Sequence, residues 1–271
     1  MSLAVVSLML VVFSFTTGEF VIAGILPDVA GGLEVSIPAA GLLVTAYALG
    51  MIAGGPVITV LTARMARKPL MTGLIVVSML ANLGSSIAPD YALLLASRCV
   101  AGLVVATFFG VAISTAFSIA PAGKQASTVA KVTLGLNLGI VLGAPLGTVI
   151  GHNLGWRATF SAVAVASAFA LAGVLRFVPA QQAVAAGSIR RELRVFTARG
   201  LQLAIALTAV GNLGIVMVFT YIAPLLTDIS GFTPGSIPLL LLVYGAGAVA
   251  GNFLGGWLSD RALMPHRLSA C

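Results

Sequence analysis

Residues 131–151 read KVTLGLNLGIVLGAPLGTVIG, and glycine returns there at every fourth position from Gly135 to Gly151. On an α-helix this period places the glycines on one slowly winding face. In water each interior glycine costs roughly 1 kcal/mol relative to alanine. In hydrocarbon the helical backbone must bond to itself, and a glycine face lets a second helix approach closely. A plain packing face would account for the glycines, and the stretch predicts a membrane helix packed tightly on another, with a local bend at Pro145.

The composition is that of a polytopic membrane protein with an all-α fold. Of the 271 residues, 59% are hydrophobic and 8% are charged, whereas about a quarter of the residues in soluble domains are charged. Apolar runs of about 20 residues mark membrane spans. Eight are predicted, near residues 4–26, 39–61, 69–88, 91–118, 127–150, 158–178, 201–226 and 236–258. The first run lacks a small-residue cleavage pattern and is expected to remain as the first span.

The net charge of +7 follows the predicted topology. If the N-terminus is cytoplasmic, the inside loops carry nearly all the cations: Arg64, Arg67, Lys68, Lys124, Arg176, Arg190, Arg191, Arg194, Arg199, Arg261 and Arg267. The outside loops carry Arg157 beside four acids, Asp28, Glu34, Asp90 and Asp228. This asymmetry is the positive-inside pattern. It predicts a multi-pass protein of the cytoplasmic membrane with a cytoplasmic N-terminus, and no nucleic-acid partner.

The sequence offers no sign of enzyme chemistry. Its two cysteines, Cys99 within a span and Cys271 at the end, predict neither a disulfide framework nor a metal site. His152 and His266 lie at predicted membrane edges and are expected to be solvated loop residues, not ligands. No nucleophile–base pair or phosphate loop is present in the sequence. We therefore expect neither an enzyme nor a bound cofactor.

Glu19 is the most unusual residue of the first span, because it lies about seven residues from the predicted outer end. A carboxylate at that depth costs a few kcal/mol on insertion scales and is a functional hypothesis by default. Arg98 lies at nearly the same depth in the fourth span. We expect the two charges to face each other or a shared aqueous cavity, with Arg98 keeping Glu19 ionised until access changes. A structural acid paired with a neighbouring helix is the alternative.

The chain repeats itself with an offset of 200 residues. The matching positions are Ile22, Ala23, Leu26, Asp28, Gly31, Ser36, Ile37, Pro38 and Gly55 with Ile222, Ala223, Leu226, Asp228, Gly231, Ser236, Ile237, Pro238 and Gly255. Phe219 occupies the position equivalent to Glu19, so the acid belongs to the first half alone. The pattern predicts a duplicated six-span unit in parallel orientation.

The repeat also predicts the domain organisation. Residues 1–178 form an N-terminal six-helix bundle, and 201–271 form an incomplete C-terminal bundle with two membrane helices. The polar residues 179–200 between them are predicted to be a cytoplasmic linker, with a short interfacial helix at 188–196. Because a complete second unit would end near residue 400, the chain is expected to be truncated after the eighth of twelve spans.

Duplicated six-span halves joined by a cytoplasmic linker resemble the major facilitator superfamily. The segment WLSDR is similar to the second-half copy of the family's signature loop, with Asp260 and Arg261 at its charged positions. In the first-half copy three cations match the basic positions: Arg64, Arg67 and Lys68. Thr59, Ala63 and Ala66 replace the family's glycine, aspartate and glycine. The resemblance implies that these loops serve conformational switching.

Two further motifs resemble those of exporters in the family. Arg98 with Gly102 matches the motif of the fourth span, which the family uses in proton coupling. The glycine stretch is similar to the antiporter motif of the fifth span, which marks exporters. Its matching positions are Gly139, Gly143, Pro145 and Gly147. The resemblance implies that this helix seals and bends as access switches.

Three segments are similar to drug–proton antiporters of the chloramphenicol-efflux group: GEFVIAGILPDVA (18–30), SIPAAGLLVTAYALGM (36–51) and FTYIAPLLTDISGF (219–232). The resemblance implies efflux of chloramphenicol or a similar lipophilic drug, driven by the proton gradient, by a protein that is monomeric in its full-length form. Glu19 would take up the proton and Arg98 would set its proton affinity. The candidate drug-pocket residues are Phe20, Asn212, Phe219, Tyr221 and Tyr244.

Two alternatives stay open from the sequence. Exporters of sugars, nucleosides or amino acids share the same fold and coupling motifs. A chain of eight spans could also be a non-transporting fragment, because half of the surface between two complete bundles would be absent.

Overall fold

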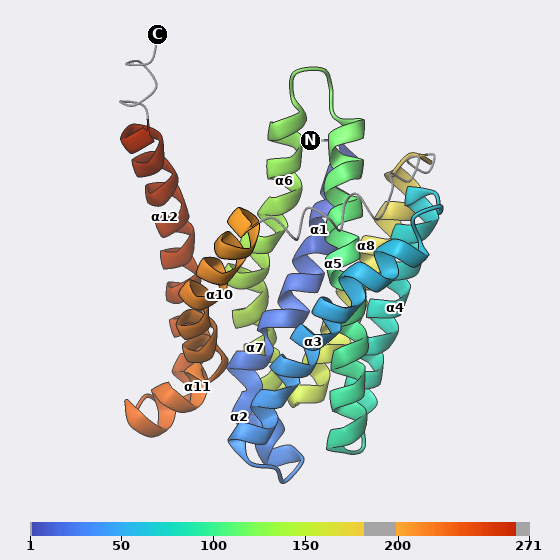
Figure 1. Ribbon diagram of the computed structural model, residues 1–271. Coiled ribbons are helices and arrows are strands. Elements are labelled where there is room, and N and C mark those ends of the chain that lie inside the picture. Colours follow the sequence, from blue (N-terminus) through green and yellow to red (C-terminus); the bar gives the residue numbers. More distant parts are fainter. Residues whose placement is uncertain (1, 182–198, 264–271) are drawn as a thin grey trace.

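The computed structural model describes residues 2–181 and 199–263, with the side chains of 252, 253 and 255–263 left out. Within these residues every regular element is helical (Figure 1). In chain order the elements are α1 (Leu3–Phe20), α2 (Ile22–Gly32), α3 (Ile37–Leu61), α4 (Arg67–Ile87), α5 (Tyr91–Ile119), α6 (Gln125–Leu138), η1 (Gly139–Gly143), α7 (Ala144–Leu154), α8 (Trp156–Phe177), α10 (Arg199–Thr220), α11 (Ile222–Pro224), η2 (Leu225–Ile229), η3 (Pro234–Ser236) and α12 (Ile237–Leu263).

The eight predicted spans are confirmed as helices. In the described part of the chain, eight helices are long and apolar enough to cross a membrane. The predicted first span is divided at Val21 into α1 and α2, and the predicted fifth span is divided into α6, η1 and α7. The chain is therefore an all-α, multi-pass membrane protein. The predicted linker falls largely at 182–198, outside the described residues.

The 200-residue repeat recurs in the element boundaries. Val21 interrupts the first span and Tyr221 interrupts the seventh. Helix α3 begins at Ile37, and α12 begins at Ile237. The two copies therefore share the same order: a long helix, a break, shorter helical segments and a second long helix.

Capping side chains and one glycine set the reversals between spans. Ser36 Oγ accepts a hydrogen bond from the Ala39 N–H (3.3 Å) at the start of α3, and Asp90 Oδ1 accepts one from the Leu93 N–H (2.8 Å) at the start of α5. Such caps satisfy N–H groups that the first turn of a helix leaves without partners. Gly155, between α7 and α8, has a φ of 88°, a conformation that favours glycine.

Helix α1 lies at the centre of the first six spans. It contacts α5, α6, η1, α7 and α8 (Figure 1). We call the end of the molecule where α1 begins the N-side, and the opposite end, where α2 lies, the α2 side. A larger hydrophobic core includes Leu8, Phe15 and Phe108. A second core includes Ile25 and Phe160, and it extends to the α2 side.

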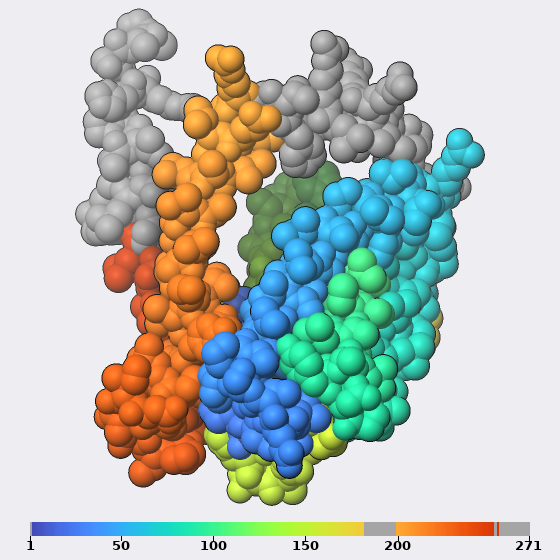
Figure 2. Space-filling model, turned by 60° about the horizontal axis from the view of Figure 1, so that its bottom comes forward, coloured from blue at the N-terminus to red at the C-terminus, as the bar shows by residue number. Residues whose placement is uncertain are grey.

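The second unit joins the first near the α2 side. Helices α10, α11 and α12 pack on α2, η1 and α7. A third hydrophobic core is shared between the units and contains Ala23, Phe219, Ala223, Ile237 and Leu241. No residue of α10 before Phe219 is buried, and Figure 2 shows an opening between α10 and α3. The units therefore meet at the α2 side and part toward the N-side.

Candidate functional site

The glycine stripe packs along α1 and α2 over its whole length. A Cβ atom added at Gly139 would lie 2.7 Å from Thr16 Cβ, and one added at Gly151 would lie 2.5 Å from Ile25 Cγ2. The added atom at Gly135 would meet the backbone of α1, and the added atom at Gly143 would meet Thr17. These distances leave no room for a side chain. The close helix contact predicted from the glycine period is therefore present, and α1–α2 is the partner.

The stripe is irregular directly before Pro145. The Ala144 N–H donates to the Gly139 carbonyl, which is a π-helical bond that spans five residues in place of four. Proline has no N–H to donate, so the helical hydrogen bonds are interrupted at Pro145 itself, directly after the widened turn. This turn also contacts the second unit, because a Cβ atom at Gly245 of α12 would lie 2.7 Å from Val141 Cα. The π-helical turn η1 therefore lies between α1 and α12.

A cavity of about 420 Å³ lies between the two units. Its lining comes from α1, α2, α3, η1, α10 and α12 and is mostly apolar. The lining residues are Glu19, Phe20, Ile22, Ala23, Val44, Tyr47, Ala48, Ile140, Asn212, Ile215, Val216, Phe219, Thr220 and Tyr244. Among the residues that the structure describes, Glu19 is the one charged residue of the lining. Four of the five candidate drug-pocket residues line this cavity together with Glu19.

Tyr221 is the exception among the candidate drug-pocket residues. It does not line the cavity, and its hydroxyl group lies against Gly41 of α3, where it packs on the second hydrophobic core. Tyr221 follows Phe219 by two residues, about 200° around a helix, so it lies on the face opposite the lining residues Asn212, Val216 and Phe219. Helical periodicity in the sequence was therefore an available signal that separates Tyr221 from the other candidates.

Three aromatic rings line the cavity where it meets the third core. The rings of Phe20 and Phe219 pack edge to face with centroids 5.5 Å apart, and Phe219 lies 5.0 Å from Tyr244. Phe219 is buried, whereas the other two rings are partly exposed. Sequence reasoning missed Tyr47 and Ile140 as lining residues. Tyr47 is the one tyrosine in the predicted second span, which was an available signal.

Arg98 contacts Tyr47 of the cavity lining but does not line the cavity itself. Its side chain is fully buried, and its three guanidinium nitrogens have no hydrogen-bond partner among the described residues. The guanidinium carbon lies 4.5 Å from the centre of the Tyr47 ring and 5.5 Å from that of Phe160. A cation over a ring face is attracted by the ring quadrupole. The guanidinium is therefore stabilised by contacts with two aromatic rings and not by an ion pair with an acid.

Glu19 and Arg98 lie near each other but do not form an ion pair. The charges are near enough to interact electrostatically. The only ion pair within the described residues joins His152 and Asp28. The sequence led us to expect that the two charges face each other or a shared cavity. The structure shows neither arrangement, because Glu19 lines the cavity, whereas Arg98 does not and stacks on Tyr47.

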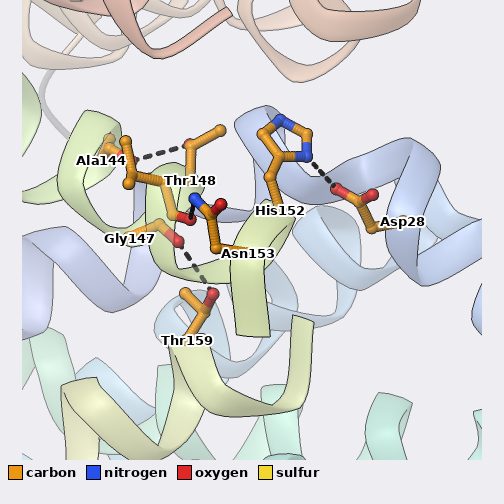
Figure 3. A network of polar contacts seen from close by, with 8 residues as sticks. Asp28, Ala144, Gly147, Thr148, His152, Asn153 and Thr159 are labelled. Carbon is orange, nitrogen blue, oxygen red and sulfur yellow. Dashed lines mark hydrogen bonds and ion pairs between the residues drawn. The ribbon is translucent and has the colours of Figure 1, made fainter. Parts of the chain in front are cut away.

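His152 is also corrected by the structure. It lies within α7, where its Nδ1 is 3.0 Å from Asp28 Oδ2 on α2 (Figure 3). Both side chains are partly exposed. In the same view the Thr159 hydroxyl donates to the Gly147 carbonyl and the Thr148 hydroxyl donates to the Ala144 carbonyl, each at 2.8 Å. His152 is therefore a helix residue that links α7 to α2, and His266 lies outside the described residues.

The first signature loop is fixed by hydrogen bonds at the N-side. The Arg67 guanidinium donates to the Ser114 carbonyl (3.2 Å), the Ser118 hydroxyl (3.1 Å) and Gln181 Oε1 (3.0 Å). Lys68 Nζ donates to the Leu175 carbonyl (2.8 Å).

The other residues of the two signature loops are less constrained or fall outside the description. Arg64 is exposed. The side chains of Asp260 and Arg261 are outside the described residues. In the described ranges no group of three His, Cys, Asp or Glu side chains could hold a metal ion.

Known proteins resemble this chain in sequence. The inner membrane transport protein YdhP of Escherichia coli K12 is 36% identical over 251 residues, which are 93% of this chain and 64% of that protein. A chloramphenicol resistance protein of Streptomyces lividans is 38% identical over 265 residues, which are 96% of this chain and 68% of that protein. The chain therefore spans about two thirds of the length of these relatives.

The fold also matches a solved structure. It is a bacterial homologue of the human lysosomal transporter Spinster in an inward-facing and unoccupied conformation. The TM-score is 0.76 at 20% identity, and the match covers 97% of this chain and 63% of that one. A family model described as Major Facilitator Superfamily matches residues 8–270. The chain therefore belongs to the Major Facilitator Superfamily, a family of membrane transporters and not of enzymes.

Proposed function

We propose that the protein exports small lipophilic drugs across the cytoplasmic membrane in exchange for protons. The observation that carries the proposal is the cavity with its single carboxylate, Glu19, among apolar and aromatic side chains. Intramembrane acids of this kind mark ion and proton pathways. The Streptomyces relative, named for chloramphenicol resistance, supports chloramphenicol or a similar antibiotic as the substrate.

The proposed mechanism couples one proton to one occupant of the cavity. Glu19 takes up a proton from outside, and the neutral acid and the bound drug affect each other's binding free energy, which is the basis of antiport. Arg98 tunes the proton affinity of Glu19 through its nearby charge. Phe20, Phe219 and Tyr244 provide the aromatic surface for the drug. No resident cofactor takes part, because the proton gradient supplies the free energy.

The charge distribution supports an N-side that faces the cytoplasm. The N-side carries Arg64 and Lys124 between helices and Arg67 and Lys68 in the first turn of α4. These cations fit the positive-inside pattern. With that orientation the opening between the units faces inward, where an exporter receives its substrate. The contact between the glycine stripe and α1 then belongs to the elements that seal and bend as access alternates.

The test is proton movement driven by the drug. In everted membrane vesicles with a proton gradient, addition of chloramphenicol should collapse the gradient when the protein is present. The Glu19→Gln variant should insert at normal abundance and lose this response, because it cannot exchange a proton. Full activity of Glu19→Gln would contradict the proposal, and an inactive wild-type chain would favour the non-transporting alternative.

The same assay separates the substrate classes. A panel of sugars, nucleosides, amino acids and lipophilic drugs is added to identical vesicles. The apolar lining of the cavity predicts a response to the drugs alone, because sugars need many buried hydrogen-bond partners. A response to a sugar or nucleoside would move the assignment to the alternative exporter class.

A further inference from the structure

The Arg98 charge is held inside the bundle by aromatic rings. A buried cation without a partner is costly, and Arg98 has neither an acid within ion-pair distance nor a hydrogen bond among the described residues. Tyr47 from α3 and Phe160 from α8 supply the two ring contacts. Cation–π contacts are stronger when they are shielded from water, as they are around this buried side chain. These rings are therefore the main stabilising contacts of the guanidinium.

The two rings differ in what else they touch. Phe160 is fully buried and packs against Trp156 with centroids 6.1 Å apart, and it does not line the cavity. Tyr47 lines the cavity together with Glu19 and also contacts Arg98. Of the two rings, only Tyr47 borders both the cavity that holds the acid and the buried cation.

Few charged or titratable groups face Glu19 from the helices around it. Arg98 comes from α5, Tyr47 from α3 and Tyr244 from α12. The residues of α2, η1 and α10 that line the same cavity carry no charge. From α4, α6 and α8 the structure gives no charged or titratable group on this cavity. Burial is the first influence on the protonation of Glu19, and the separation from Arg98 is the second.

We infer that Tyr47 is a positioning residue that keeps Glu19 and Arg98 apart by covering the guanidinium with its ring. This inference rests on the proposed function, because a transporter that carries protons needs an acid that can be protonated. In a low-dielectric interior, a direct pair with arginine would hold the carboxylate in its charged form. With the ring in place Arg98 influences Glu19 from a distance, and the acid stays able to take up and release its proton.

The test measures protonation of Glu19 without transport. Dicyclohexylcarbodiimide reacts with protonated carboxyl groups in apolar surroundings, and labelling of Glu19 is followed by mass spectrometry between about pH 5 and pH 9. The variants Tyr47→Leu and Tyr47→Met should shift half-maximal labelling to lower pH by about one to three units, because Arg98 can then pair with Glu19. Tyr47→Phe keeps the ring and should keep the wild-type profile.

Phe160→Leu is the matched control. It removes the other ring on Arg98 and opens no path to the cavity, so its labelling profile should stay at the wild-type position. Equal shifts in Tyr47→Leu and Phe160→Leu would overturn the inference, as would an unchanged profile in Tyr47→Leu or Tyr47→Met. A wild-type Glu19 that is unlabelled at every pH would also overturn it, because the acid would then be permanently ionised.

The labelling separates this inference from the proposed function. If vesicles show no drug-driven proton movement but the labelling profiles shift as expected, export is wrong and the role of Tyr47 stands. If export occurs and the Tyr47 variants label like the wild type, the role of Tyr47 is wrong and export stands.

Discussion

Replacing a single glycine of the stripe is expected to destabilise the protein, because the neighbouring helix occupies the space that a side chain would need. A Cβ atom at Gly143 would lie 2.8 Å from Thr17 Cβ and 3.0 Å from Thr17 Cγ2. Overpacking of this kind typically costs about 1–3 kcal/mol. We therefore expect Gly143→Ala to lower the melting temperature of the detergent-solubilised protein. Thr17→Ala, which removes Oγ1 and Cγ2, should restore part of the loss in the double variant.

Gly73 provides the control for that substitution. It also lies within a membrane helix, and a Cβ atom there would meet nothing within 4 Å. Gly73→Ala should leave the melting temperature unchanged or raise it, because alanine favours the helix. Equal losses in Gly73→Ala and Gly143→Ala would show that the helix contact is unimportant.

Arg98 is expected to be a functional residue that contributes no stability. A buried charge without an ion-pair partner carries a desolvation cost that an apolar side chain of similar size does not. Arg98→Met should therefore keep or raise the melting temperature, while drug-driven proton movement in vesicles is lost. A strongly destabilised Arg98→Met protein would show that the two ring contacts outweigh the cost of burying the charge.

At the scale of helices, the sequence predicted the elements well and their contacts only in part. Apolar length is enough to place eight spans, because hydrocarbon thickness imposes it. The glycine period showed that one face must meet a helix, but nothing in a single sequence ranks the possible partners, and α1 was found from the structure. The sequence predicted that Glu19 and Arg98 lie near each other, and they do. It did not predict the Tyr47 ring, which contacts Arg98 and lines the same cavity as Glu19.

The contact between α7 and α2 is expected to depend on backbone approach more than on its ion pair. Asp28 and His152 are partly exposed, and such pairs contribute about 0–1 kcal/mol. His152→Gln should therefore lower the free energy of unfolding by no more than about 1 kcal/mol, measured by denaturant titration. Asn153→Gln, on an exposed position of the same helix, is the matched control. A loss of several kcal/mol in His152→Gln alone would show that the pair holds the two helices together.

At the scale of the molecule, the first six spans are expected to fold without the second unit. In an apolar stretch of 18 residues from each span, 61% of the residues are buried in Leu3–Phe20, but 11% are buried in Arg199–Thr220 and 17% in Pro234–Gly251. Two of the three hydrophobic cores lie almost entirely within the first unit, and the third is the small core between the units. The free energy of folding of the first unit therefore comes almost wholly from its own contacts.

A chain that ends at residue 181 tests this independence. It should insert, remain monodisperse in detergent and melt no more than about 5 °C below the full chain, because it loses only the third core, the Tyr221 contact and the packing of the second unit on α2, η1 and α7. The glycine stripe and α1 are both retained in it, so Gly143→Ala should lower its melting temperature by the same amount as in the full chain. Aggregation of the shortened chain, or a larger effect of Gly143→Ala in the full chain, would show that α12 on η1 shares in holding the stripe against α1.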